Sequence, residues 1–118
     1  MKPVSDLVYH ITEKERWLQA LKDGIYTPAA YDQDGFIHLS TRAQVLGVAN
    51  FLYAGKPDLV LLYIDPERVG QPLVYENLEG GETLFPHLYA PLPIDAVETV
   101  YDFAAGEDGL FLLPDGED

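Results

Sequence analysis

The feature that most constrains the fold is Leu59–Ile64, where six consecutive residues are apolar. A strand without polar residues on either side is stable only when both faces of its sheet are covered. A chain of 118 residues is long enough to bury such a core within one domain. We therefore predict a single domain over residues 1–118, with a core from about 7 to 103 and an acidic tail over 104–118.

Hydrophobic spacing predicts two helices in the N-terminal half and mostly strands after them. Trp17, Leu18 and Leu21 form the apolar stripe of a helix that ends at Gly24, and Val45 to Leu52 recur at helical spacing. Residues 25–34 are turn-prone and predict a surface loop, a candidate lid. Strands are predicted at 7–11, 36–39, 59–64, 73–76, 84–89 and 97–103, with Pro86 at an edge or a bulge, and residues 110–113 are predicted to pack back onto the sheet. The fold class is α+β.

Each predicted helix begins with a capping box, in which a hydroxyl residue is followed three positions later by Glu or Gln. The first pair is Thr12 with Glu15, and the second is Thr41 with Gln44. A histidine lies shortly before each box. The chain thus opens with one unit twice: strand, histidine, apolar residue, hydroxyl residue and capped helix.

The composition excludes several classes of protein. Twenty acidic residues against seven basic ones give a net charge of −13, which repels nucleic acid and anionic membranes at long range. The absence of cysteine excludes disulfides and thiolate chemistry. No apolar run approaches the ~20 residues of a membrane span, and the first residues show no signal peptide. We expect a cytoplasmic protein with a small-molecule partner; the sequence leaves the oligomeric state open.

The histidines of the chain, His10, His38 and His87, each lie in a short aromatic and apolar block. One histidine in such a strand is usually a satisfied core residue. Three blocks that hold every histidine instead favour one shared pocket. Imidazole, with an ordinary pKa of ~6.5, is suited to acid–base catalysis in such a pocket.

Two other uses of the histidines stay open. They can ligate a metal together with Glu76 or Glu82, but no close pair such as His-x-His supports this, so no metal is expected. His10-Ile11-Thr12 and His38-Leu39-Ser40 are also typical of phosphoesterases in which one histidine is the base and another the acid.

The start of the second helix is a candidate anion site. Ser40, Thr41 and Arg42 lie where unpaired backbone N–H groups and the helix dipole favour a phosphate. The hydroxyl groups are equally explained as helix caps, with Arg42 as a surface residue.

Several blocks resemble an uncharacterised bacterial family, domain-of-unknown-function family nine-five-two. They are Tyr9-His10-Ile11-Thr12, Gly35 through Thr41, Gln44-Val45 through Ala49-Asn50, and Gly81-Glu82 through Tyr89. The fold of that family is similar to the ADP-ribosyltransferase superfamily, which binds NAD in a cleft between two small sheets. The resemblance thus implies two small antiparallel sheets that form a cleft, with two helices from the N-terminal half, and NAD as cofactor.

The resemblance also implies roles for individual residues. His10 matches the strand histidine that holds an NAD ribose, and Phe36 to Thr41 match the aromatic or Ser-Thr element. Independently of the resemblance, aromatic residues that can stack a planar ring or belong to the core surround the histidine blocks: Tyr9, Tyr26, Tyr31, Phe36 and Tyr89. The superfamily's catalytic glutamate falls close to His87, and Glu82 lies a few residues upstream. The RNA 2′-phosphotransferases of this superfamily also lack the glutamate and use basic residues on a phosphate.

The expected function is therefore that of a small enzyme acting on NAD or a related ADP-ribosyl or phosphorylated nucleotide. In this hypothesis His10, His38, His87 and Glu82 are the catalytic candidates, and His10, Phe36, Ser40, Thr41, Arg42 and Tyr89 bind the cofactor. A non-catalytic nucleotide-binding module is the alternative, and a metal-dependent or two-histidine phosphoesterase is the third reading.

Overall fold

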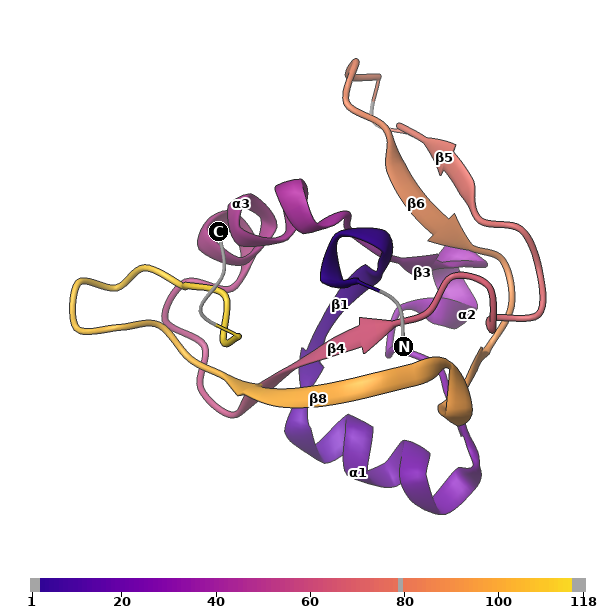
Figure 1. The fold of residues 1–118 in the computed structure, drawn as a ribbon, viewed down its shortest axis with the longest axis horizontal. Helices are drawn as coiled ribbons and strands as arrows, with labels where there is room; N and C mark the ends of the chain where they lie inside the picture. Colours follow the sequence, from indigo (N-terminus) through magenta and orange to yellow (C-terminus); the bar gives the residue numbers. More distant parts are fainter. Residues whose placement is uncertain (1–2, 79, 116–118) are drawn as a thin grey trace.

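The computed structural model describes residues 3–78 and 80–115, and its centre is a three-stranded antiparallel sheet (Figure 1). This main sheet has the order β1 (Val8–Glu13), β4 (Leu59–Ile64) and β8 (Val97–Phe103). Every residue of β4 is buried, as predicted for an apolar strand covered on both faces.

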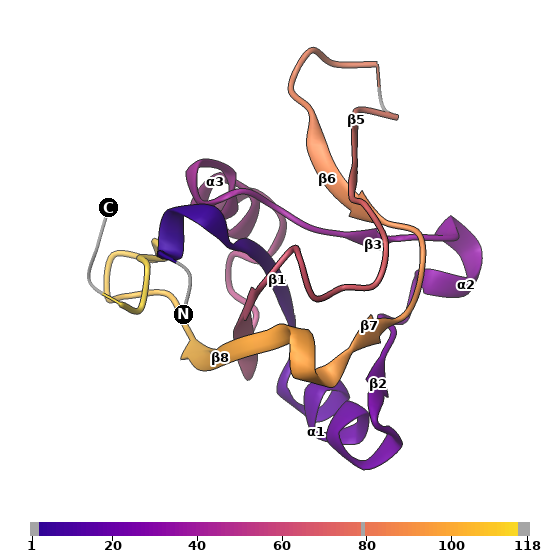
Figure 2. The ribbon, with the colours of Figure 1, turned by 45° about the vertical axis from the view of Figure 1, so that its right-hand side comes forward.

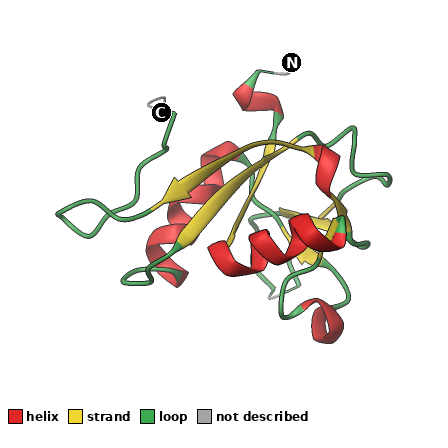
Figure 3. Cartoon of the chain, turned by 90° about the horizontal axis from the view of Figure 1, so that it is seen from below, coloured by secondary structure: helices red, strands yellow, loops and turns green. Residues whose placement is uncertain are grey.

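Alternate residues of β4 face two separate clusters of core side chains. Val60, Leu62 and Ile64 pack with residues of α1 (Lys14–Asp23). Leu59, Leu61 and Tyr63 pack with residues of α3 (Arg42–Leu52). The two helices lie on opposite sides of the main sheet (Figures 1 and 3). This double cover explains why β4 carries no polar residue.

A second sheet projects from the main sheet (Figure 2). It has the order β3 (Ile37–His38), β6 (Phe85–Leu88) and β5 (Val74–Glu76), and we call it the hairpin sheet. A third sheet pairs β2 (Ile25–Tyr26) with β7 (Leu92–Pro93). The short helices are η1 (Val4–Asp6), α2 (Tyr31–Asp34) and η2 (Ile94–Ala96).

The described residues thus form an α+β fold with three antiparallel sheets and three α-helices. The prediction of two sheets and two helices was wrong in number. The extra sheet and helix come from residues 25–34, predicted as a loop, which hold β2 and α2. Two-residue strands and a four-residue helix are too short to show a hydrophobic period in the sequence.

Of the two predicted capping boxes, one is present. Thr41 and Gln44 cap α3, and Gln44 Oε1 accepts from the backbone N–H of Thr41 at 3.0 Å. Thr12 does not cap α1, because β1 continues through it to Glu13, which is the residue that precedes the helix. Its hydroxyl lies instead 2.8 Å from that of Tyr26.

Two finer predictions also need correction. Of the predicted apolar stripe of α1, Trp17 is buried, whereas Leu18 and Leu21 are about half exposed; Ala20 is the other buried residue of the helix. Pro86 lies in the central strand of the hairpin sheet and not at its edge. Proline is tolerated there because β3 ends at His38, so no β3 residue opposite Pro86 requires an N–H donor. The carbonyl of Pro86 accepts from the backbone N–H of Leu39 at 3.0 Å.

The C-terminal tail packs back onto the main sheet, as predicted. Phe111 and Leu113 are buried in the cluster on the α3 side. The backbone N–H of Phe111 donates to Asn50 Oδ1 at 2.8 Å. The predicted tail reaches residue 118, and its last residues, 116–118, lie outside the described part.

Within residues 3–78 and 80–115, no helix has the length and apolar character that crossing a bilayer requires.

Candidate functional site

All three histidines line one cleft of about 960 Å³. Its walls are β1, α3, the hairpin sheet and the segment around residues 28–30. Strand pairing brings the histidines together, because His10 lies on β1 while His38 and His87 face each other on β3 and β6. The structure therefore gathers residues that are 77 positions apart in sequence at their extremes, as the shared-pocket prediction requires.

His10 is buried, and both of its ring nitrogens have protein partners. Nδ1 lies 2.7 Å from the carbonyl oxygen of His38, and Nε2 lies 2.7 Å from the hydroxyl of Tyr26. Burial lowers the pKa of His10 to about 4, so the ring is neutral at pH 7. A neutral ring with both nitrogens engaged has no nitrogen left to hold a ribose hydroxyl.

His38 and His87 lie side by side in the cleft. They are direct neighbours across β3 and β6, and their ring centroids lie 5.2 Å apart with the rings inclined by 70°. His87 is almost fully buried, whereas 60% of the His38 side chain is exposed. The Phe36 ring stacks on His87 at 4.2 Å and so restricts its orientation.

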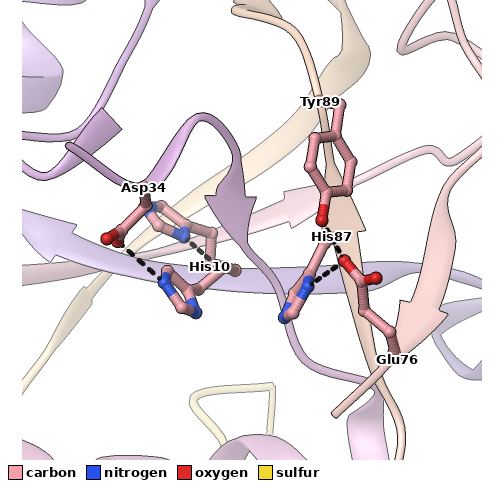
Figure 4. Close-up of polar contacts among 6 residues, drawn as sticks. His10, Asp34, Glu76, His87 and Tyr89 are labelled. Carbon is pink, nitrogen blue, oxygen red and sulfur yellow. Dashed lines mark hydrogen bonds and ion pairs between the residues drawn. The ribbon is translucent and has the colours of Figure 1, made fainter. Parts of the chain in front are cut away.

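Each imidazole of this pair has a carboxylate partner. Glu76 Oε2 lies 2.8 Å from Nδ1 of His87 and also accepts from the hydroxyl of Tyr89, as Figure 4 shows. Asp34 Oδ2 lies 3.0 Å from Nε2 of His38. A carboxylate on one ring nitrogen fixes the ring and leaves the other nitrogen free to exchange a proton with a ligand.

Neither carboxylate was predicted as a partner of a histidine. Glu76 was predicted only as a possible metal ligand or base, and Asp34 only as part of a surface loop. The signal for Asp34 is its position four residues before His38 at the end of α2. Glu76 is placed by the register of the β5–β6 hairpin, in which Val74 is opposite His87, and no local pattern reports that register.

Four predicted site residues do not line the cleft. Thr41 caps α3 and Tyr89 holds Glu76. Glu82 is exposed on the loop between β5 and β6. The side chains of Arg42 and Asp115 are only 11% and 13% exposed and form a bidentate ion pair. Phosphate binding by Arg42 therefore does not fit this arrangement, because its guanidinium already has a carboxylate partner. Phe36 and Ser40 do line the cleft.

Other lining residues were not predicted. Arg16 and Lys56 give the cleft its basic groups, and Glu13 adds an acidic one. Apolar side chains of α3, including Val48 and Phe51, form another wall. Gly47 lies on this wall, and a Cβ built there meets nothing within 4 Å. Together these residues make a cleft with a polar, histidine-bearing floor and an apolar side.

Replacing Tyr89 by phenylalanine is expected to raise the pKa of Glu76. The hydroxyl of Tyr89, followed by the ring of His87, holds that pKa below its ordinary value. A 13C NMR titration of the Glu76 carboxyl group measures the change. Tyr75→Phe, in the same hairpin, is the control and should leave the titration unchanged. An unchanged Glu76 in the Tyr89 variant would contradict the hydrogen bond.

Acid is expected to destabilise the protein through His10. The pKa of about 4 in the folded protein lies below the ordinary histidine value of 6.5, so the unfolded chain binds the proton first. Stability from this group is therefore complete above pH 6.5 and is lost as the pH falls to 4, by about 3 kcal/mol. Urea unfolding of wild type and His10→Asn at both pH values tests this. Equal pH dependence in the two proteins would contradict a buried neutral His10.

Among the described residues, no group of three or more His, Asp or Glu side chains is arranged to hold a metal ion. The three histidines contact carbonyl, hydroxyl and carboxylate groups of the protein, as described above.

Residues 11–100 match the model of a family described as "Protein of unknown function (DUF952)". The chain is also similar to protein CC0527 from Caulobacter crescentus, a structural-genomics target. Its crystal structure gives a TM-score of 0.82 at 36% identity, over 92% of this chain and 96% of that one. Its solution NMR structure gives 0.81 at 36% identity, over 93% and 95% of the two chains. The search of curated proteins returned no match.

Proposed function

The chain belongs to the DUF952 family of proteins of unknown function, and we propose that it is a small enzyme acting on NAD or a related ADP-ribosyl or phosphorylated nucleotide. The observation that carries the proposal is the opposed pair His38 and His87, each with a carboxylate partner, in the wall of a large cleft. The similarity to the ADP-ribosyltransferase fold is part of this proposal.

The size and lining of the cleft suit a nucleotide. A volume of about 960 Å³ lies at the upper end of the ~300–1,000 Å³ that ligand pockets usually have. Arg16 and Lys56 are the cationic groups available to a phosphate, in place of Arg42. Phe36 and the apolar wall of α3 are available to a base or a sugar face.

The two imidazoles suit a transfer reaction. Glu76 accepts from Nδ1 of His87, so Nε2 carries a lone pair and can take a proton from an attacking hydroxyl group or water. His38, once protonated beside Asp34, can give a proton to the departing group. The bond to the leaving group breaks as the bond to the acceptor forms, and the two histidines exchange their protonation states.

A two-histidine phosphoesterase is the second candidate, favoured by the 5.2 Å separation of the His38 and His87 rings. The sequence suggested His10 and His38 as its pair. His10 is neutral and fully engaged, so His87 takes its place in this hypothesis. Product analysis separates the candidates, since transfer from NAD releases nicotinamide whereas phosphoester hydrolysis releases phosphate or an alcohol.

Binding is tested by titrating the protein with NAD, ADP-ribose and inorganic phosphate and following the histidine ring signals by NMR. We expect saturable shifts of His38 and His87 with at least one nucleotide. Gly47→Leu should abolish these shifts, because the new side chain enters open space in the cleft. The same substitution removes a helix-destabilising glycine, so the variant should stay folded.

The control for the cleft-filling variant is Lys22→Leu, which adds a similar side chain at an exposed position of α1 outside the cleft. It should bind as the wild type does. Absence of any shift at millimolar nucleotide would overturn the proposal. Saturable binding without any product would instead identify a nucleotide-binding module.

A further inference from the structure

Within the described residues, β1 and the segment that follows β3 meet at one isolated bridge, between Tyr9 and Ser40. Tyr9 and Ser40 exchange two backbone hydrogen bonds of 2.8 Å there. In a continued antiparallel ladder, the next such pair would be Ile11 with His38, two residues further along each strand. The carbonyl oxygen of His38 instead accepts from the His10 ring at 2.7 Å. At this point β1 continues into the main sheet and β3 into the hairpin sheet.

The partners of His10 determine where its proton lies. A carbonyl oxygen can only accept, so Nδ1 carries the hydrogen and donates to His38. The neutral ring then accepts at Nε2, and the hydroxyl of Tyr26 is the donor. A phenol has one hydrogen, so the 2.8 Å contact between Tyr26 and Thr12 is donated by the Thr12 hydroxyl. The chain of donors runs from Thr12 through Tyr26 and His10 to the backbone of His38.

We propose that His10 is a positioning residue whose ring takes the place of the missing backbone hydrogen bond between Ile11 and His38. The ring separates the two sheets at the cleft while it satisfies the carbonyl of His38. Because that carbonyl belongs to a two-residue strand, the ring of His10 fixes the backbone from which the His38 imidazole projects. The catalytic consequence rests on the proposed function, whereas the positional consequence can be tested without any ligand.

The first test locates the proton of His10 in the wild-type protein. Long-range 1H–15N NMR on histidine-labelled protein distinguishes a protonated ring nitrogen from an unprotonated one. We expect the proton on Nδ1 and a bare Nε2 at pH 7. A proton on Nε2 alone would overturn the proposal, because Nδ1 could then not donate to the His38 carbonyl.

The second test compares His10→Ala with His10→Asn, whose amide N–H can reach the same carbonyl. Alanine is expected to shift the ring signals of His38 and to lower turnover by about 10–100-fold, since misplaced reacting groups cost rate steeply. Asparagine should keep the His38 signals near those of the wild type and restore most of the turnover. Equal behaviour of the two variants would overturn the positioning role.

The two tests also separate this inference from the proposed function. If no nucleotide binds but His10→Ala still displaces the His38 signals and His10→Asn does not, the positioning role holds and the proposed function fails. If His10→Ala does not fold, the proton position in the wild type and the His38 signals of His10→Asn decide the matter.

Discussion

Replacing Arg42 by methionine is expected to lower the free energy of unfolding by about 1.5–3 kcal/mol, because the partly buried Asp115 carboxylate keeps the hydrogen bond from the Tyr63 hydroxyl but loses the charged guanidinium. Asp115 accepts two hydrogen bonds from the guanidinium, of 3.0 and 2.7 Å. The guanidinium also donates to the hydroxyl of Tyr9 at 2.9 Å. Urea unfolding followed by circular dichroism measures the loss.

The double variant Arg42→Met with Asp115→Leu is the informative control. Replacing a buried ion pair by apolar residues of similar volume is often neutral, so most of the stability should return. Nucleotide binding should be near that of the wild type in the double variant, because Arg42 does not line the cleft. Loss of binding together with recovered stability would instead support the phosphate-binding role predicted from the sequence.

Replacing His87 or His38 by glutamine is expected to lower turnover of the nucleotide by about 10²–10⁴-fold while changing its affinity little. In the proposed mechanism each imidazole transfers one proton. Glutamine keeps much of the size and polarity of histidine but cannot transfer a proton in this way. Because the two act as a unit, the double variant should lose little more than either single one. Nicotinamide release or phosphate release, followed chromatographically beside a separate binding isotherm, measures both quantities.

Glu82→Gln separates this assignment from the sequence-based one. Glu82 is exposed and does not line the cleft, so its replacement should leave turnover unchanged. A large loss in this variant, with little effect of His87→Gln, would return the catalytic role to the glutamate. Circular dichroism of each variant shows whether a loss of turnover reflects unfolding.

The parts of the fold that were predicted correctly are those with a local cause. The apolar run of β4 requires cover on both faces, and the Thr41–Gln44 box places the start of α3. The aromatic and apolar blocks around the three histidines predicted a shared pocket, and all three histidines line one cleft. Their roles as acid and base stay predictions.

The parts that were missed depend on register and on distant pairs. Glu76 reaches His87 through the pairing of two strands, and Asp115 reaches Arg42 across 73 positions. His10 was expected to hold a ribose because the resemblance to the ADP-ribosyltransferase superfamily implied that role. The sequence alone does not show which groups lie beside a histidine in a strand. Only the divergence of β1 from β3 turns its ring toward a carbonyl of the protein.

The contact between the tail and α3 also sets the order in which the chain can complete its fold. While the polypeptide is being synthesised, α3 emerges long before Asp115, so the ion pair between Arg42 and Asp115 can form only near the end of synthesis. The side of the main sheet that receives Phe111 and Leu113 stays open to water for the same period. Native packing of the helix that walls the cleft therefore waits for residues at the far end, and long-range closure of this kind is slow. A nascent chain that ends before Phe111 exposes an apolar face of the main sheet, and exposed surface of this kind is what chaperones bind.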